Sequence, residues 1–311
     1  MGPSILTVTV NPAIDRTYTV PGFSLNTVHR SNAAVSTIGG KGINVARVYR
    51  TLGGDARTTG FIGGSTGELI RRGLNAEGIP NDFIGIGGES RICLKIMDPL
   101  AGTQTEINET GPVVLDADCD ALCERLRELL PGCAYLVLSG SLPPGAPVDL
   151  YARAIRLAQD ELGIAAVLDA SGAALEHGIA ASPYLVKPNV FELGALGIDP
   201  EPIEVAAQQL RDRYGVAVAL VTAGARGAAV SSTDTVWSAK APEIDVKSAV
   251  GSGDALIAGF LWSLGNRADL PSALALGIGA GAANGMSYGA GFCKREEILD
   301  LASRTVVNLF A

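Results

Sequence analysis

The run "ILTVTV" at residues 5–10 is apolar along its length instead of alternating apolar with polar residues. This pattern is typical of a parallel strand that is covered on both faces. Similar runs occur at "AYLVLS" (134–139), "AAVLDA" (165–170), "YLVKP" (184–188) and "AVALVTAG" (217–224), with helical patterns at 41–52, 65–77, 117–130, 147–162 and 202–214. Strands that alternate with helices predict an α/β fold, a doubly wound and mostly parallel sheet with helices on both faces. Beyond residue 250 the sequence is mostly helical.

Two segments break this rhythm. Residues 13–37 and 83–109 alternate polar with apolar residues and contain turn signals. Such segments predict antiparallel strands with one face in water, so we expect a small antiparallel β lid over one edge of the main sheet. No linker or repeat interrupts the rest, and residues 1–311 are therefore predicted to form one domain with an inserted lid.

Composition and charge restrict the function. Hydrophobic residues make up 47% of the chain and charged residues 18%, as in an ordinary globular protein. The net charge of −8 argues against a nucleic-acid partner, because such surfaces need a basic field. Five cysteines without scaffold spacing and two histidines argue for reduced thiols and against a zinc cluster. We read neither a signal peptide nor a membrane span, so the expected location is cytoplasmic, with no membrane partner.

The stretch "SAVGSGDALIAGFLWSLG" (248–265) predicts a helix whose first turn is unusual. Its apolar face suits a core, yet it opens with Gly251, Ser252 and Gly253, and Asp254 follows. One interpretation is helix capping, since Asp is favoured near unpaired N-terminal amides. The other is that the bare amides bind an anion and the carboxylate takes part in chemistry. On this stretch alone, capping is the better supported of the two.

Other polar elements follow the predicted strands or open helices. They are "NPAIDR" (11–16) with Asp15, "IGGKGINVARVYRTLGG" (38–54) with Gly40, Lys41 and Asn44, "SGSLPPG" (139–145) with Ser139, "VKPNVFELGAL" (186–196) with Lys187, Asn189 and Glu192, and "VTAGARGAAV" (221–230) with Thr222, Gly224 and Gly227. Taken singly, each has a structural explanation as a turn, a cap or a solvated cation, and Arg91 on a lid strand does too. Taken together, most lie at the sheet edge where α/β folds bind ligands.

These motifs resemble the ribokinase/PfkB family of carbohydrate kinases over essentially the whole chain. "GGKGINVA" is similar to the family's first signature and "GSGDALIAGF" to its second. "NPAIDR", "SGSLPPG" and "KPNVFEL" are most similar to the hexose-phosphate kinase branch, which holds 1-phosphofructokinase, tagatose-6-phosphate kinase and a minor 6-phosphofructokinase. The resemblance implies a ribokinase-like fold and phosphorylation of fructose 1-phosphate by ATP, with the other two activities as alternatives.

The resemblance also implies a role for each matching residue. Asp254 would be the catalytic base, and Gly251, Ser252 and Gly253 the anion hole for the γ-phosphoryl group. The sugar-phosphate site would comprise Asp15, Gly40, Lys41, Asn44, Arg91 and Ser139. The ATP site would comprise Lys187, Asn189, Glu192, Thr222, Gly224, Gly227 and, at the adenine end, Asn284. Glu192 and Asn189 would hold Mg²⁺ through water, and we expect a homodimer that forms through the lid.

Departures from the family pattern limit these expectations. Ser248-Ala249 replaces the Asp-Thr pair that many relatives carry before the second signature, which leaves a monovalent-cation site open. Cys93 stands where close relatives often have Asn, which weakens any inference about sugar selectivity. Two other classes are an NAD-binding Rossmann oxidoreductase and a non-catalytic sugar-phosphate-binding homologue. The missing G-x-G-x-x-G after the first strand argues against the first, and intact Asp254, Lys187 and Asn189 argue against the second.

Overall fold

The computed structural model describes residues 2–31, 33–233 and 235–310 and contains one large sheet. Its strands run in the order β14-β13-β12-β11-β10-β9-β8-β1-β4-β5. They are β1 (Ser4–Thr9), β4 (Asp55–Gly63), β5 (Ile84–Ile86), β8 (Cys133–Ser139), β9 (Ala165–Asp169), β10 (Leu185–Val186), β11 (Val218–Thr222), β12 (Ala228–Ser232), β13 (Thr235–Ala239) and β14 (Val307–Phe310). The seven strands from β5 to β11 are parallel and the last three antiparallel, which confirms the predicted mostly parallel sheet.

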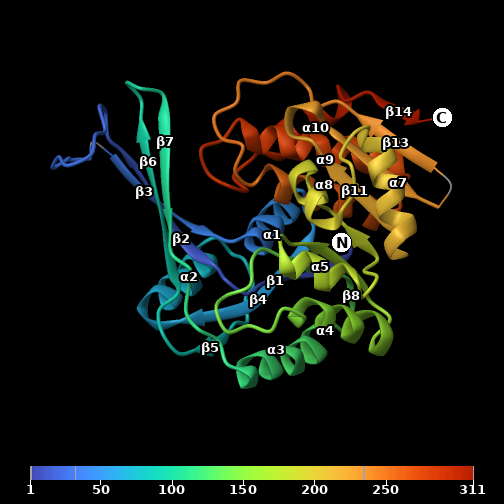
Figure 1. Cartoon of the computed structure of the whole chain (residues 1–311), viewed down its shortest axis with the longest axis horizontal. Helices are drawn as coiled ribbons and strands as arrows, with labels where there is room; N and C mark the ends of the chain where they lie inside the picture. Colours follow the sequence, from blue (N-terminus) through green and yellow to red (C-terminus); the bar gives the residue numbers. More distant parts are fainter. Residues whose placement is uncertain (1, 32, 234, 311) are drawn as a thin grey trace.

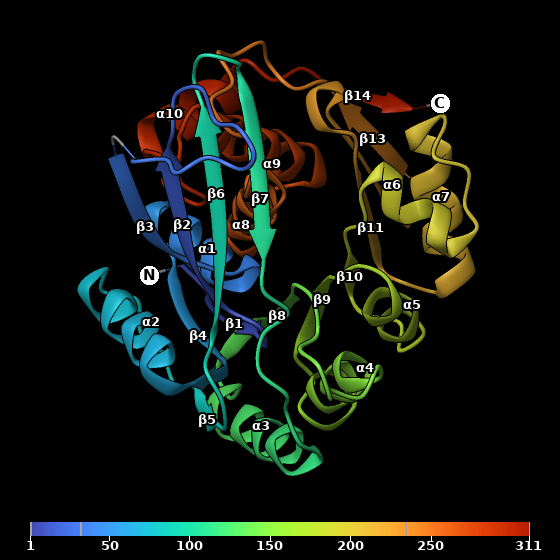
Figure 2. The same cartoon turned by 60° about the vertical axis from the view of Figure 1, so that its left-hand side comes forward.

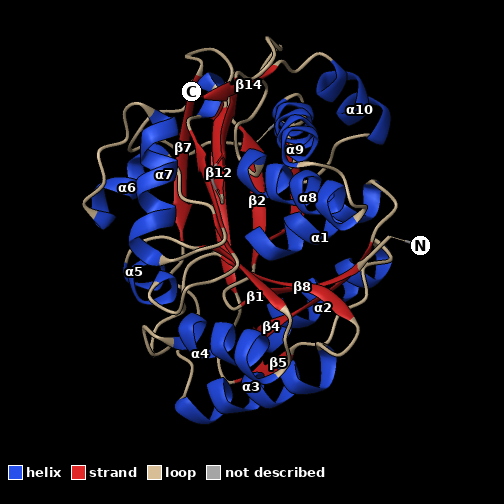
Figure 3. Cartoon of the chain, turned by 90° about the vertical axis from the view of Figure 1, so that its right-hand side faces the viewer, coloured by secondary structure: helices blue, strands red, loops and turns tan. Residues whose placement is uncertain are grey.

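Helices cover both faces of this sheet, as Figure 3 shows from the side. They are α1 (Lys41–Thr51), α2 (Gly64–Ala76), α3 (Asp116–Leu129), α4 (Leu150–Arg156), α5 (Ala173–Ile179), α6 (Val190–Leu193), α7 (Ile203–Tyr214), α8 (Ser252–Gly265), α9 (Leu270–Gly285) and α10 (Arg295–Ser303). No helix within the described ranges is long and apolar enough to cross a membrane.

The apolar strand runs supply two cores at once. In β1, Ile5 packs into the core with α1, α8 and α9, whereas its neighbour Leu6 packs into the core with α3, α4 and α7. In β11, Leu220 and Val221 divide between the same two cores. Because successive side chains of a strand point to opposite faces, only a continuously apolar strand can fill both cores.

A second sheet of four strands stands away from the main body (Figures 1 and 2). It comprises β2 (Ala13–Thr19), β3 (Ala33–Gly39), β6 (Arg91–Asp98) and β7 (Thr103–Asn108), in the order β3-β2-β6-β7. Its outer pairs are antiparallel, but the central β2–β6 pair is parallel, because the two hairpins come from separate segments of the chain. We call this sheet the lid.

Two strands of the main sheet, β5 and β14, lie where the sequence predicts another structure. Part of segment 83–109, β5, extends the edge of the main sheet beside β4 and does not join the lid. The C-terminal region, expected to be mostly helical, ends in β14, which pairs with β13. Both strands are short, and neither carries the long apolar run that identifies a central strand.

Close packing of α8 against α9 fixes the start of α8. A Cβ added at Gly259 would lie 2.7 Å from the carbonyl oxygen of Leu276, and one added at Gly277 would lie 3.0 Å from that of Leu256. Glycines therefore let the two backbones approach each other. The same packing reaches the first turn of α8, because a Cβ added at Gly281 would lie 3.0 Å from the carbonyl oxygen of Ser252.

Candidate active site

A cavity of about 1110 Å³ lies between the lid and the edge of the main sheet where the parallel strands end. The predicted residues that line it are Asp15, Gly40, Lys41, Asn44, Arg91, Lys187, Asn189, Thr222, Gly224, Gly227, Gly251, Ser252, Gly253 and Asp254. They come from the lid, from the starts of α1, α6 and α8, and from the ends of β10 and β11. The structure thus brings together residues that are more than 200 positions apart in the sequence.

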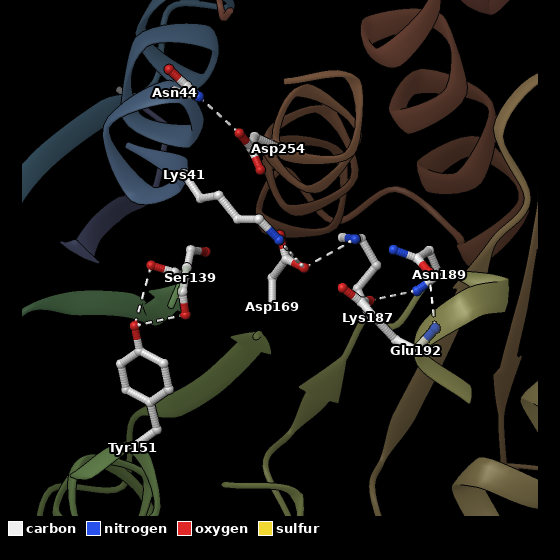
Figure 4. Close-up of polar contacts among 10 residues, drawn as sticks. Lys41, Asn44, Ser139, Tyr151, Asp169, Lys187, Asn189, Glu192 and Asp254 are labelled. Carbon is white, nitrogen blue, oxygen red and sulfur yellow. Dashed lines mark hydrogen bonds and ion pairs between the residues drawn. The ribbon is translucent and has the colours of Figure 1, made fainter. Parts of the chain in front are cut away.

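Asp254 lies in the first turn of α8 and is buried. No side chain within the described ranges caps this helix, so the carboxylate of Asp254 does not accept hydrogen bonds from the N-terminal amides of α8. It instead accepts a hydrogen bond of 2.8 Å from Nδ2 of Asn44 on α1 (Figure 4). Asp254 therefore makes no capping hydrogen bond within the described ranges, and its position leaves the carboxylate facing the cavity.

Burial, and after it the negative charge of Asp169, raise the pKa of Asp254, and the net effect of all its neighbours is a pKa of about 7. The ammonium of Lys41, the hydrogen bond from Asn44 and the ammonium of Lys187 act in the opposite direction. A carboxyl group poised near neutral pH can accept a proton from a hydroxyl group, because its affinity for protons is matched to the working pH.

Two lysines meet at Asp169, the last residue of β9 (Figure 4). Oδ1 of Asp169 lies 3.1 Å from Nζ of Lys187 and 3.5 Å from Nζ of Lys41. Burial acts to raise the pKa of Asp169, but the two lysines together hold it below its ordinary value. In turn, the charge of Asp169 raises the pKa of Lys41. Asp169 thus joins a cation from α1 to a cation from the end of β10.

Lys187 also lies beside the first turn of α8. A Cβ added at Gly253 would lie 3.3 Å from Nζ of Lys187. A positive charge and uncapped helix amides therefore face the same space, which is an arrangement that binds anions.

The lid contributes a second polar group to the cavity. A Cβ at Gly39 would overlap the carboxylate of Asp15, so that glycine allows β3 to close on this side chain. Burial raises the pKa of Asp15, and the charges of Lys95 and Arg91 oppose this effect. Arg91 donates from Nε to the carbonyl oxygen of Asn11 at 3.1 Å and lines the cavity beside Asp15.

The start of α6 shows the opposite arrangement to that of α8. Oδ1 of Asn189 accepts hydrogen bonds from the amides of Phe191 (2.9 Å) and Glu192 (3.0 Å), and Oε2 of Glu192 accepts one from the amide of Asn189 (2.8 Å). This is a complete capping box, so the capping interpretation is confirmed here. Asn189 still lines the cavity, whereas Glu192 does not.

Ser139 and Asn284 do not line the cavity. Ser139 is fully buried at the end of β8, where its carbonyl oxygen accepts a hydrogen bond from the hydroxyl of Tyr151 (Figure 4). Nδ2 of Asn284 donates to Val250 and Ser252, and its Oδ1 accepts from the amide of Gly291. In this structure, Asn284 therefore supports the first turn of α8, and its role at the adenine end stays a prediction.

Sequence reasoning missed two charged residues of this region. Asp169 lies near the end of the strand run "AAVLDA". A charged residue at the carboxyl end of a buried parallel strand is a signal that indicates a ligand site, and this signal could have identified Asp169. Arg47 lies inside "GGKGINVAR", and it is buried although arginine side chains are mostly exposed. A single sequence gives no sign of this burial.

The chain matches the pfkB family of carbohydrate kinases over residues 8–297. A structure of phosphofructokinase-2 from Escherichia coli, in complex with potassium, is 30% identical with a TM-score of 0.91, over 97% of this chain and 99% of that one. A protein from Thermotoga maritima described as a possible 1-phosphofructokinase is 28% identical with a TM-score of 0.88, over 99% and 100% of the two chains. Ribokinase from Thermotoga maritima, at 19% identity and a TM-score of 0.76 over 97% and 99%, shares the fold. The chain is a carbohydrate kinase and belongs to the pfkB family.

Proposed function

We propose that this kinase transfers the γ-phosphoryl group of ATP to the C6 hydroxyl of fructose 1-phosphate. One observation carries the chemistry. Asp254, a buried carboxyl group with a pKa of about 7, faces the cavity from an uncapped helix start that Lys187 flanks. Phosphoryl transfer depends on positioning and charge neutralisation, and these are the groups present here.

In this proposal each side of the cavity has its own task. Asp15, Lys41 and Arg91, on or beside the lid, bind the phosphosugar, since two of them are cationic and the third can accept bonds from hydroxyl groups. Asp254 takes the proton of the attacking hydroxyl. The amides of the Gly251–Gly253 turn bind the transferred group, where preorganised donors meet the charge that develops. The lid excludes water, which would otherwise compete as acceptor.

Lys187, Asn189 and the Thr222–Gly227 loop bind ATP in this proposal. They line the side of the cavity away from the lid, at the ends of β10 and β11. The loop follows β11 directly and turns back into β12 through a short 3₁₀ segment (Gly224–Arg226), and its residues line the cavity.

The donor chemistry on the nucleotide side fits Mg²⁺. Oδ2 of Asp169 is buried, and within the described ranges no side-chain or backbone group bonds to it. Mg²⁺ prefers oxygen ligands and usually keeps several waters, so Asn189 at the cavity wall and Glu192 in the same helical turn would hold it through water. When bound with ATP, the ion neutralises charge on the phosphoryl oxygens.

A fructose 6-phosphate acceptor is the second candidate, favoured by the similarity to phosphofructokinase-2, one structure of which is in complex with fructose-6-phosphate. Tagatose 6-phosphate is the third. A coupled assay of ADP release should compare these three phosphosugars and ribose at matched concentrations. We expect the highest kcat/KM with fructose 1-phosphate. A preference for fructose 6-phosphate would select the second candidate, and a preference for ribose would contradict the phosphosugar proposal.

We further propose a homodimer that forms through the lid. β7 is exposed along its length, as is most of β3, and Val35 on β3 is 60% exposed. Light scattering should give twice the mass of the 31.9 kDa chain. The measured mass should be lower for Val35→Asp. A monomeric wild-type protein would contradict the proposal.

The five cysteines are free, which supports a cytoplasmic location.

A further inference from the structure

Arg47 is a buried arginine behind the site that the proposed mechanism does not use. It lies on α1, one turn after Asn44, and is 7% exposed. All five of its N–H donors have partners, two of them on Glu77 through Nε (2.7 Å) and Nη2 (3.2 Å). A surface arginine would leave most of these donors to water, so this set of bonds indicates a fixed position.

The remaining donors of Arg47 reach three separate elements. Nη2 donates to the carbonyl oxygen of Ile38 on lid strand β3, and Nη1 donates to that of Ala290 in the loop after α9, each at 3.0 Å. Nη1 also donates to Oδ1 of Asn44 at 3.0 Å. Arg47 therefore links the lid and the α9–α10 loop to the residue that bonds to Asp254.

This last contact determines how the amide of Asn44 is oriented. An arginine can only donate hydrogen bonds, so the side of the amide that faces Arg47 must be its oxygen. The NH₂ group of Asn44 then points to Asp254, to which Nδ2 donates at 2.8 Å. Without Arg47 the amide can turn over, and its oxygen then faces the carboxylate. That arrangement is repulsive unless Asp254 is protonated and donates the bond itself.

We propose that Arg47 is a positioning residue, which holds the amide of Asn44 so that it donates to Asp254 and keeps that carboxylate ready to accept a proton. The inference rests on the proposed role of Asp254 as the base. It extends that role through one residue that touches neither the substrate nor the reacting atoms.

The same geometry gives the expected pH dependence. The charged groups that act on Asp254 are Asp169 on β9, Lys41 on α1 and Lys187 after β10, and none of them is changed by a substitution at Arg47. The hydrogen bond from Asn44 lowers the pKa of Asp254. Losing that bond therefore raises this pKa, so the acidic limb of the kcat profile moves to higher pH.

The test is a double-mutant cycle with Arg47→Met and Asn44→Ala in the full-length enzyme. Methionine has a similar length but no donor. We expect Arg47→Met to lower kcat by on the order of 10- to 100-fold, as a misplaced reacting group does. In the Asn44→Ala background the same change should alter kcat by no more than about twofold. The acidic limb should shift in the same direction in both single variants. Arg47→Lys, again a pure donor, should recover part of kcat and return the limb towards its original pH.

A purely structural role gives different results. Arg47→Met would then lower kcat by the same factor in both backgrounds and leave the acidic limb in place, which would overturn the inference. Failure of both Arg47 variants to fold would overturn it as well. Arg50→Met is the matched control, because Arg50 lies one turn further along α1 and pairs with Asp55 at 3.9 Å. Its kcat should stay within about twofold of the wild type.

Failure of the base assignment is distinguishable from failure of this inference. If Asp254→Asn keeps its turnover, Asp254 is not the base, whatever the cycle shows. If Asp254→Asn is inactive and the two substitutions in the cycle act independently, the base assignment stands and the role of Arg47 is contradicted.

Discussion

Two helices begin at the same cavity, and their first turns are built in opposite ways. The start of α6 is closed, because Asn189 and Glu192 bond to each other's backbone amides. The start of α8 is open, because Gly251, its N-cap, has no side chain and Asp254 bonds to Asn44 instead. The two sequences, "NVFE" and "GSGD", both place an acidic residue in the first turn, where capping is the common explanation.

The difference shows what separates a capped helix from an anion site. A side chain that can turn back to the amides satisfies them, and the helix start then serves stability. At α8 glycine replaces that side chain, and the packing of α8 on α9 holds the turn without a cap. The amide of Ser252 donates to the carbonyl oxygen of Ala249 at 3.2 Å, and the amides of the two flanking glycines face a ligand without a capping side chain. The carboxylate becomes available for proton transfer.

The largest expected effect comes from Asp254→Asn, which removes the carboxylate from the open turn. We expect kcat to fall by about 10²- to 10⁴-fold, the usual contribution of a general base. Asp269→Asn is the matched control, since Asp269 caps α9 and Asn caps equally well. Near-normal turnover of Asp254→Asn in the coupled assay would contradict its role as base.

The same substitution should stabilise the fold. The folded pKa of Asp254, about 7, lies above its ordinary value of 3.8, so the folded state holds this proton more tightly. Wild-type stability therefore falls as pH rises from about 4 to about 7, by an amount on the order of a few kcal/mol. Asparagine does not titrate, so the stability of Asp254→Asn should lack this fall with pH. The variant should therefore have a larger free energy of unfolding than the wild type at pH 8. Denaturant unfolding at pH 4.5 and 8 measures the free energy of unfolding of both proteins. Equal stability at pH 8 would contradict the raised pKa.

Lys187→Met tests the cation that flanks the open turn. A lost hydrogen bond to a charged group costs about 1.5–3 kcal/mol, so KM for ATP should rise by on the order of 10- to 100-fold. Arg91→Ala, on the lid, should raise KM for the phosphosugar instead. Lys294→Met is the surface control, since Lys294 is 77% exposed. Steady-state kinetics with each substrate varied in turn measures KM for ATP and KM for the phosphosugar. If each variant raises both KM values equally, Lys187 and Arg91 do not belong to separate subsites.

The smallest effect is expected at the closed turn. Asn189→Ala should lower the free energy of unfolding by about 1 kcal/mol through loss of the cap. Asn189→Ser keeps a capping oxygen and should restore most of that stability. If Asn189→Ser is stable but loses activity, Asn189 acts on the nucleotide or its metal as well as on the helix. Thermal unfolding and kcat of both variants separate the two roles.

Much of the fold could be predicted because its signals are local. Continuous apolar strands identify the parallel sheet, since each must fill a core on both faces, and alternating segments identify the lid. The short strands β5 and β14 could not be placed, because pairing with a neighbour and not their own pattern makes them strands. The parallel β2–β6 pair likewise depends on how two distant hairpins meet.

The site was predictable where residue type and position coincide. Lys41, Asn44 and Asp254 were found because glycines and polar groups follow strands or open helices. Asn284 and Ser139 could not be placed, because only the tertiary structure shows that Asn284 bonds to the loops around the start of α8 and that Ser139 is buried beside Tyr151. Arg47 and Asp169 are charges within largely apolar stretches of sequence, and the charged partners that hold them, Glu77 and Lys187, come from other elements.

The most direct test of the account is the pH profile of kcat for the wild type and Asp254→Asn at saturating ATP and phosphosugar. A base with a pKa of about 7 predicts that wild-type kcat falls tenfold per pH unit well below that pH. The residual kcat of Asp254→Asn should lack this limb, which separates the titration of Asp254 from that of the substrate phosphates near pH 6. A wild-type kcat that stays constant down to pH 5, or the same limb in Asp254→Asn, would contradict the assignment of Asp254 as the base.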